Sequence, residues 1–454
     1  MKPKYFLALG LLVLGLGSCG ESFFEQYPSN NITEGNFYKT DDDFNQGVVA
    51  CYAKLKTQMS FHLTEIGYRG DENVLESMAV STQNRYDIDH FAETANNGIL
   101  NDIWNAWYNG IYRCNDVLDH MTGAKIANYD KYRGECLFLR SWWYFNLYRV
   151  FGVVPITRTV VTPAAAKLIP RCTEEEMYTL LTEDLAEAAR LLPPTPGPEK
   201  ARVANIAAYT LLAKVYLTFG KPAEAKTALE EAMKNTSYGL ESTTKKVFDV
   251  GNKMNREIIF ALYYNKTNDN GHGYWYSANT DVLADINNPT PTFKAIYDCE
   301  KDNRLPLISS YTKIKDNLFA MTKWYDTYDA TYTTQVGNDF PHLRYADVVL
   351  MYAEALAESG GSLGDALEWL NKTRTRAGLD ELTTDEVKSL AEFRRELAAE
   401  RGREFDLVRL GLAVDYFREM GYSLDSHNLI FPIPQNQIEI VNNPSILWQN
   451  PGFN

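Results

Sequence analysis

Apolar residues recur every three or four positions along several stretches of the chain, which is the spacing that places them on one face of an α-helix. The clearest stretch covers residues 202–235. Ala204 and Val215 belong to one apolar stripe there, Gly220 ends the first helix, and Pro222 opens the second. Small residues on the two facing stripes allow antiparallel helices to pack closely. The pattern predicts a helical pair of the tetratricopeptide type, whose repeat is about 34 residues long.

The same spacing predicts further helices along the chain. A second pair is expected over 343–376, and residues 100–150 are a candidate third pair. The stretch 132–150 carries aromatic residues on nearly every face, which predicts a helix buried between neighbours. Four tryptophans lie on these apolar stripes and are predicted to be core residues: Trp104, Trp107, Trp142 and Trp143.

Two helix starts are marked by capping-box spacing. Thr40 with Asp43 opens a helix that is expected to run to about Lys56, and Thr173 with Glu176 opens one that reaches the proline-rich stretch after residue 192. In such a box each side chain accepts a hydrogen bond from the other residue's backbone N–H.

Residues 236–342 differ in kind from the helical stretches. They are rich in Asn, Asp, Thr and Tyr, and only residues 258–264 resemble a strand. A long irregular insertion among helices is normally functional or disordered, and the aromatic residues here disfavour disorder. The predicted fold is mainly α, a superhelix of tetratricopeptide-like pairs with an irregular, loop-rich insertion containing a little β-structure. The chain is predicted to form a single interlocked body. Its parts are a signal peptide at 1–18, a lipidated tether at 19–35, an N-terminal helical region at 36–235, the insertion at 236–342 and a C-terminal helical region at 343–454.

The N-terminus has the pattern of a bacterial lipoprotein signal peptide. Lys2 and Lys4 precede an apolar run at 6–16 that is too short to span a bilayer as a mature helix. Small residues then lead into Cys19, as in a lipobox, and the alternative is an ordinary secretory signal with a stray cysteine. Acylation of Cys19 would anchor a tether over 19–35 to a membrane without a spanning helix. Gly20, in place of Asp, favours the outer membrane.

Charge and cysteine content exclude several classes of protein. The net charge of −14 disfavours nucleic-acid binding, which needs a basic footprint. It also disfavours strongly anionic polymers, unless a local basic patch intervenes. No cofactor or metal is expected, because histidines and cysteines lack ligand spacing and no Walker or Rossmann glycine pattern occurs; calcium in the insertion stays open. The number of cysteines after Cys19 is odd, which argues against a disulfide framework and predicts scattered, mostly buried thiols. They are Cys51, Cys114, Cys136, Cys172 and Cys299.

Motifs along essentially the whole mature chain resemble the SusD/RagB family of outer-membrane nutrient-binding lipoproteins. The most specific are RYAD at 344–347 with MYAEA at 351–355, and FPIP at 431–434 with QNPG at 449–452. Weaker matches are 134–140, 151–155, 202–217, 370–379 and 396–409. The resemblance implies an α-superhelical scaffold and a lid-like association with a SusC-like TonB-dependent transporter.

Charged residues within these motifs are predicted to be structural rather than catalytic. Arginine and carboxylate side chains in an apolar helical context can lock helices together by bidentate hydrogen bonds. Catalysis by Glu400 or Glu404 would require a cleft that holds two carboxylates, which motif position does not supply, so we do not expect an enzyme. The arginines are Arg140, Arg344, Arg374, Arg376, Arg401 and Arg409, and the acids are Glu135, Asp347, Glu354, Glu396, Glu400, Glu404 and Asp406.

Two segments combine aromatic and hydrogen-bonding side chains in the way that sugar recognition requires. Flat rings contact sugar C–H groups, and Asn, Asp, Gln or Arg binds hydroxyls. One segment is 81–87, in the connection after the first helix, and the other is 268–277, in the insertion. The resemblance implies sugar-contacting aromatics on comparable loops. Trp275 is the first candidate, followed by Tyr274, Tyr276, Tyr86, Asn84 and Arg85; Trp324 and Tyr325 either bind ligand or pin the insertion to the helices.

The function expected from these observations is capture of an oligosaccharide or polysaccharide at the cell surface and its delivery to the transporter. Two alternatives stay open at this point. One is a peptide- or protein-binding member of the same family, and the other is a lipid-anchored hydrolase with a helical body.

Overall fold

A computed structural model of the chain describes residues 37–66, 69, 83–197, 199–265, 277–279, 295–297, 300–309, 311–315, 318–321, 323, 337–383, 396–397 and 403–453. Within these ranges the architecture is mainly helical, with two small antiparallel sheets. The predicted helical fold with a little β-structure is confirmed. The division at residues 235 and 342 stays a prediction.

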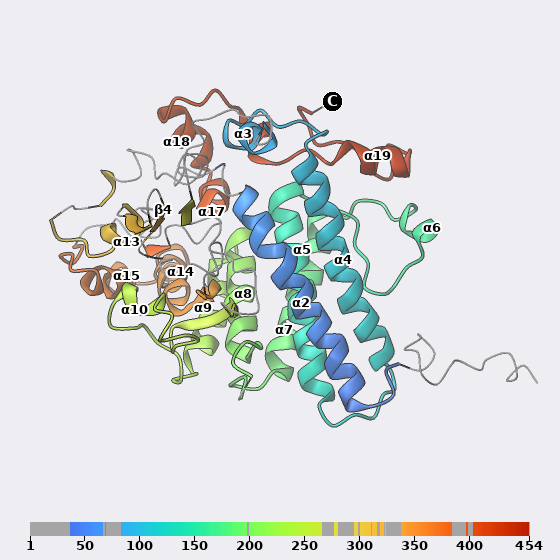
Figure 1. Cartoon of the computed structure of the whole chain (residues 1–454), viewed down its shortest axis with the longest axis horizontal. Helices are drawn as coiled ribbons and strands as arrows, with labels where there is room; N and C mark the ends of the chain where they lie inside the picture. The colour runs from blue at the N-terminus through green and yellow to red at the C-terminus, as the bar shows by residue number, and fades with distance from the viewer. Residues whose placement is uncertain are drawn as a thin grey trace, which may run out of the picture.

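The main helices form a continuous row in which each packs against the next (Figure 1). The three predicted pairs, over 100–150, 202–235 and 343–376, are neighbours in this row. The first helix, α2 (Asp41–Ile66), lies against α4 and α5 and extends past the predicted end at Lys56. In order, the row is α4 (Gly98–Met121), α5 (Tyr129–Phe151), α7 (Glu174–Leu191), α8 (Asn205–Thr218), α9 (Pro222–Met233), α14 (Tyr345–Glu358) and α15 (Leu363–Arg376).

Local capping explains where these helices begin and end. The backbone N–H of Asp43 donates to Thr40 Oγ1 over 3.2 Å, and that of Thr40 donates to Asp43 Oδ2 over 2.7 Å. Thr173 and Glu176 form the complete capping box at the start of α7. Both predicted helix starts are confirmed. α5 ends at Gly152, whose φ of +71° is a backbone conformation that favours glycine.

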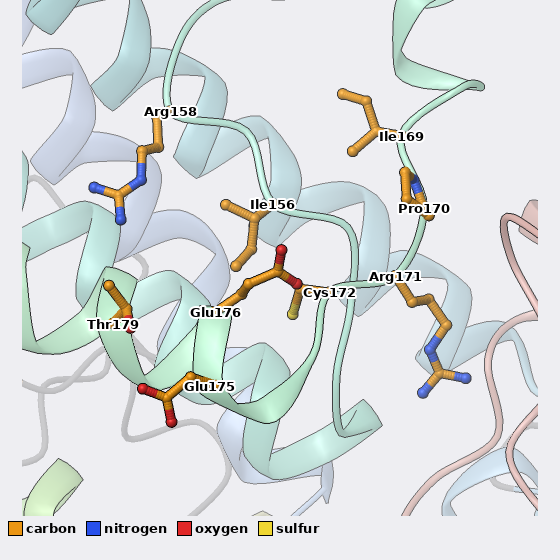
Figure 2. A pocket seen from close by; sticks show the side chains of 9 residues that line it. All are labelled: Ile156, Arg158, Ile169, Pro170, Arg171, Cys172, Glu175, Glu176 and Thr179. Atoms are coloured by element: carbon orange, nitrogen blue, oxygen red, sulfur yellow. The ribbon is translucent and has the colours of Figure 1, made fainter.

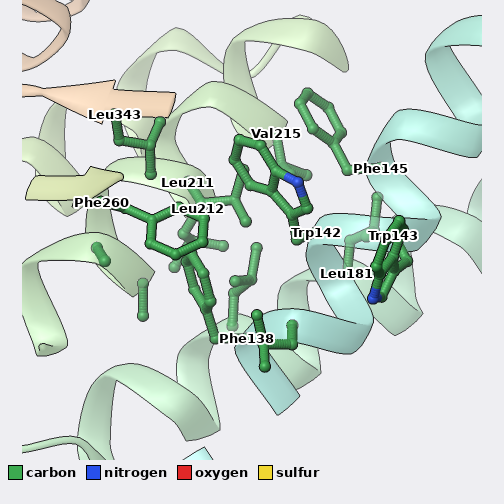
Figure 3. Close-up of a cluster of buried hydrophobic side chains, with 14 of the residues drawn as sticks. Phe138, Trp142, Trp143, Phe145, Leu181, Leu211, Leu212, Val215, Phe260 and Leu343 are labelled. Carbon is green, nitrogen blue, oxygen red and sulfur yellow. The ribbon is translucent and has the colours of Figure 1, made fainter. Parts of the chain in front are cut away.

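The helix α5 is buried on almost every face by aromatic packing (Figure 3). Its Phe138 and Trp142 meet Phe260 of the strand β1 (Ile258–Leu262) edge-on, with ring centroids 5.1 and 5.4 Å apart. Trp143 packs on Gly110 of α4, where a Cβ would lie 2.2 Å from the indole. The four tryptophans predicted to be core residues are all buried, which confirms that prediction.

Three of the cysteines meet at one point in the core. The thiol of Cys51 on α2 donates to the Gly47 carbonyl over 3.4 Å and lies close to the thiols of Cys114 on α4 and Cys136 on α5. The prediction of scattered thiols is therefore wrong for these three, because each lies on the inner face of a helix and the three helices pack together. The described cysteines, Cys172 included, are buried and free, as predicted. Cys299 lies outside the described residues.

The insertion is built on two small sheets. In one, β1 pairs antiparallel with β5 (Phe340–Arg344), which leads directly into α14. In the other, β4 (Leu318–Met321) lies between β2 (Ser277–Asn279) and β3 (Tyr311–Lys315). Two short helices, α10 (Thr244–Val247) and α13 (Leu305–Ser309), complete the described part.

A buried cluster of charges joins the insertion to the helical row. Arg344 Nη1 donates to Glu257 Oε1 over 2.7 Å and to Glu396 Oε1 over 2.8 Å. Arg376 contacts the same two carboxylates, and Arg304 bridges Glu396 to Asp302. Three arginines thus face three carboxylates, and all six side chains are at most 5% exposed. Opposite charges in equal number make this burial tolerable.

The C-terminal segment folds back over one end of the helical row. It contains α17 (Arg403–Arg409), α18 (Ala413–Glu419), the 3₁₀-helix η6 (Ser426–Leu429) and α19 (Gln435–Val441) (Figure 1). Arg171 fixes this segment, because its guanidinium donates to the Trp448 carbonyl over 2.8 Å and to Asn450 Oδ1 over 2.7 Å. Arg171 also donates to backbone carbonyls of the motif at 151–155, directly after α5. The motifs at 151–155 and 449–452 therefore meet at a single arginine.

Candidate functional site

The described part of the first predicted ligand segment, residues 83–87, is helical, whereas the sequence suggested a connection between helices. Residues Gln83–Asp89 form α3, which lies at the end of the molecule that α18 also occupies (Figure 1). Tertiary packing decides this, since Phe91, just after α3, meets Phe417 of α18 with ring centroids 4.9 Å apart. The Asn428 side chain also donates to the Phe91 carbonyl over 3.3 Å.

Tyr86 on α3 is partly committed to packing. Its ring stacks on His90 with centroids 3.8 Å apart and an interplanar angle of 17°. The side chain also packs against the main hydrophobic core. One ring face is therefore occupied, and the half-buried Tyr86 can offer a sugar at most its other face.

Asn84 and Arg85 are placed differently. Asn84 is exposed and Arg85 is half-exposed. The backbone carbonyl of Asn84 accepts a hydrogen bond of 2.9 Å from Asn97, and Asn97 caps α4 through the N–H of Ile99. The cap of a long buried helix thus holds the backbone that presents the Asn84 amide to solvent.

The remaining predicted ligand residues, Tyr274, Trp275, Tyr276 and Trp324, lie outside the described residues, as does Tyr325. The nearby register is informative. Ser277 of β2 pairs with Ala320 of β4 in an antiparallel ladder. Tyr276 directly precedes Ser277 in the chain, and Trp324 follows Ala320 after three residues.

A hollow beside the start of α7 has the mixed polarity of a potential chemical site (Figure 2). It has a volume of about 380 Å³, and Cys172, Glu175 and Glu176 line it. Burial raises the pKa of the Cys172 thiol to about 11, so it is not a thiolate at neutral pH. Glu176 accepts the capping bonds of Thr173, and Arg171 is turned away toward the C-terminal segment. The lining residues supply neither an activated nucleophile nor a histidine.

Several of the charged motif residues form arginine–carboxylate pairs, as predicted, although some of their partners, such as Asp184, lie outside the motifs. Arg140 makes a bidentate contact with Asp184, with N–O distances of 2.8 and 2.9 Å. Arg409 likewise binds both oxygens of Glu354. Arg374, which is half-exposed, donates to the backbone carbonyl of Asp380. Glu404 is buried, while Glu400 and Arg401 lie outside the described residues.

A mostly apolar groove of about 350 Å³, which the sequence did not single out, lies beside α4. Its walls include Tyr108 and Tyr112 of α4, Ile440 of α19, and the loop that carries α6 (Pro163–Ala166). Large apolar side chains are exposed around it: Tyr112 at 44%, Leu168 at 71% and Ile440 at 45%. Tyr112 follows Trp104 and Tyr108 at intervals of four residues along α4. Its exposure could not be predicted from this spacing, because it depends on where the C-terminal segment folds back.

Two further observations concern metals and membranes. Among the residues that the structure describes, no group of three or more His, Cys, Asp or Glu side chains is arranged to hold a metal ion. None of the helices in those ranges is both long enough and apolar enough to cross a lipid bilayer.

Two family models match the chain and together cover most of it. One, described as starch-binding and associating with the outer membrane, matches residues 27–217, and the other, the SusD family, matches residues 299–453. The chain belongs to the SusD/RagB family. This confirms the resemblance that the motifs at 344–355 and 431–452 suggested.

Relatives and solved structures agree with this assignment over nearly the whole length. A SusD-like protein of Formosa agariphila is 25% identical, over 99% of this chain and 100% of the relative. A SusD-like protein of Bacteroides fragilis superimposes with a TM-score of 0.78 at 21% identity, covering 94% of this chain and 100% of the other. A laminarin-binding SusD-like protein gives 0.77 at 24% identity, covering 91% and 100%. Surface glycan-binding protein A of Bacteroides thetaiotaomicron gives 0.76 at 21% identity, covering 92% and 100%.

Proposed function

We propose that this SusD/RagB protein is a non-enzymatic, lipid-anchored receptor at the cell surface. It captures an oligosaccharide or polysaccharide and delivers it to a SusC-like TonB-dependent transporter in the outer membrane. The observation that carries the proposal is the match of residues 27–217 to a family model described as starch-binding and associating with the outer membrane.

The ligand site that we propose is formed by α3 and the insertion. Asn84 and Arg85 supply exposed or half-exposed hydrogen-bonding groups on α3. Trp275, with Tyr274, Tyr276 and Trp324, supplies the aromatic rings from the insertion. Rings with polar edges beside amide and guanidinium groups fit the two-sided chemistry of a sugar. The names of solved relatives, laminarin-binding and surface glycan-binding, support this class of ligand.

The transporter-facing surface that we propose is the rim of the α4 groove. Tyr112 and Ile440 line this hollow and are 44% and 45% exposed. A contiguous exposed apolar patch of this kind usually marks an interaction site with a protein or a membrane. Removal of that apolar area from water on docking would supply the driving force for association.

A glycan array tests the capture step. The soluble chain from residue 37 onward is applied to neutral polysaccharides, their oligosaccharides and a set of peptides, and the best binder is then titrated by calorimetry. We expect a glycan to bind, Trp275→Ala to abolish binding, and Asn84→Ala to weaken it about tenfold. Tyr263→Ala is the matched control, because Tyr263 is a tyrosine exposed to 43% that belongs neither to α3 nor to the segment 268–277.

Two outcomes would contradict the proposal. Binding of peptides in place of glycans would favour the peptide-binding alternative, and turnover of any bound glycan would favour a hydrolase. A large fall in the melting temperature of Trp275→Ala would show that this ring is a core residue and not an anchor.

Co-purification with a SusC-like transporter tests the delivery step. Tyr112→Glu with Ile440→Glu places charge on the apolar rim and should abolish co-purification. Leu363→Glu, on a leucine exposed to 41% at the start of α15, is the control that should leave it intact. Equal retention by both variants would show that the groove does not contact the transporter.

A further inference from the structure

A second cavity lies where the ends of three buried helices meet the C-terminal segment. It has a volume of about 620 Å³, within the roughly 300–1,000 Å³ that small-ligand sites occupy. The C-terminal ends of α5 and α8, the start of α7, α17, η6 and the chain around Trp448 surround it. No residue of α3 lines this cavity, which we call the Trp448 pocket.

Two rings of the Trp448 pocket are held in place from behind. Trp448 is 41% exposed, and the guanidinium of Arg171 lies over its ring, 4.9 Å from the centroid. The same guanidinium binds the Trp448 carbonyl, so the backbone and the ring are fixed together. Tyr148 stacks on Phe219 with centroids 4.9 Å apart, which fixes the second ring. A ligand would therefore meet rigid aromatic surfaces and would pay little ordering entropy.

Hydrogen-bonding capacity in the pocket is left unused by the protein. The guanidinium of Arg149 lies between the rings of Phe145 and Phe405, at 4.6 and 4.2 Å from their centroids. Within the described part of the chain its single hydrogen bond goes to Asn146, and its buried Nε has no partner. An arginine held flat by two rings but not paired with a carboxylate presents an aligned set of donors.

Acceptors and further donors complete the set. Glu174 receives one long bond of 3.4 Å from the Tyr148 hydroxyl, and the exposed Ser426 hydroxyl makes no hydrogen bond among the described residues. The indole N–H of Trp448 is likewise unpaired there. Planar guanidinium and carboxylate groups can each bind two neighbouring hydroxyls at once, which is the arrangement that a sugar ring offers.

The charge balance indicates a neutral ligand. Burial lowers the pKa of Arg149 to about 10, and the nearby carboxylates of Glu404 and Asp406 oppose that shift. Arg171 adds a second positive charge to the lining, and Glu174 adds a negative one. Arg409, which also lines the pocket, is neutralised by Glu354 and Asp406. The pocket is therefore not the local basic patch that an acidic polymer would need in a chain of net charge −14.

We propose that the Trp448 pocket is a second carbohydrate site, which takes one or two neutral pyranose units stacked on Trp448 and hydrogen-bonded by Arg149, Glu174 and Ser426. This rests on the proposed function for the class of ligand but uses none of the same residues. A polysaccharide that occupies both sites of one molecule gains affinity from the second contact, because that contact forms at a high effective concentration.

Calorimetry on the glycan that the array identifies tests this inference, with a short oligosaccharide and with the polymer. The wild type should bind about two short oligosaccharides per chain, and Trp448→Ala should bind about one, with the polymer affinity falling about tenfold. Arg149→Met keeps an apolar contact with Phe145 and Phe405 but removes the hydrogen-bond donors. It should reduce binding as Trp448→Ala does, while the Trp448 ring stays in place. Tyr263→Ala is again the matched control.

The outcomes separate this inference from the proposed function. Binding of one oligosaccharide that depends on Trp275 but is indifferent to Trp448→Ala and Arg149→Met overturns the second site and leaves the receptor function intact. Loss of all binding in Trp448→Ala with no effect of Trp275→Ala would make the Trp448 pocket the sole site, and would overturn the proposed α3 site. If no glycan on the array binds, both proposals fall.

Discussion

The helices before residue 235 and the insertion after it are held together by different physics. The first region is an apolar core in which α5 contributes buried rings such as Trp142 and Trp143. The second is joined to the helical row through the charge cluster of Arg344, Glu257 and Glu396. Burial of apolar area is non-directional, whereas a buried ion cluster is stable only if every partner is in place. A substitution that slightly alters the packing of the first region should therefore destabilise the protein less than the loss of one charge in the second region.

The largest effect is expected from breaking the charge cluster. Arg344→Met leaves Glu257 and Glu396 with one partner fewer, and we expect a loss of about 3–5 kcal/mol in the free energy of unfolding. Chemical denaturation measures the loss, and hydrogen exchange should locate it at β1, β5 and the start of α14. A loss below about 1 kcal/mol would mean that the cluster is not a joint between the two regions.

A core truncation in the helical region should cost less and act differently. Leu181 of α7 is fully buried, and Leu181→Ala should lower the free energy of unfolding by about 3 kcal/mol through lost burial and a cavity. Hydrogen exchange should then rise across α5, α7 and α8 together. If exchange rose instead at β1 and β5, the contrast between the two regions would be wrong.

The cluster also predicts a dependence on pH. Burial alone would raise the pKa of Glu396, but Arg376, Arg344 and Arg304 lower it well below its ordinary value of 4.5. At Glu396 the unfolded chain therefore binds more protons than the folded chain once the pH falls below about 5, and the stability that this residue contributes is lost as the pH drops. Burial raises the pKa of Glu257 in the same cluster, which acts in the opposite direction, so the effect of Glu396 is isolated by comparison with a variant. Melting temperatures of the wild type and of Glu396→Gln, measured between about pH 7 and 3, check this. The variant should start lower and lose less, and parallel curves would contradict the assignment.

The smallest effect is expected at a helix start. Thr173→Ala removes the side chain that caps α7 and should cost about 1 kcal/mol. Thr162→Ala is the control, since Thr162 caps only the four-residue, exposed α6 and its loss should be close to neutral. Thermal denaturation distinguishes the two, and equal losses would show that the capping box contributes nothing specific.

Much of the fold could be predicted because the signals are local. Capping boxes join residues three apart, and the apolar stripes repeat every three or four residues, so the three helical pairs and the start of α7 were visible in the sequence. The end of α2 was not, because the helix continues past the predicted end at Lys56 to Ile66. The stretch containing α3 was likewise predicted to be a connection between helices.

The candidate site was less visible. Residue type alone identified Asn84, Arg85 and Trp275, but it could not show that Tyr86 uses one ring face on His90. Residue type and spacing also did not identify Trp448 as a candidate binding residue. The nearest signal was the QNPG motif that follows Trp448 directly, and its significance depends on Arg171, which lies 277 residues away in the chain.

The amino-acid sequence by itself determined which stretches are helical, which faces are apolar, and which family the motifs match, because each of these properties is written in short-range spacing. Only the tertiary structure decided which arginine meets which carboxylate and where the C-terminal segment lies. Arg344 reaches Glu396 across 52 residues and Glu257 across 87, and no local pattern carries such a pairing. The apolar groove and the Trp448 pocket both form where that returning segment covers the helix ends, so they exist only in the folded chain.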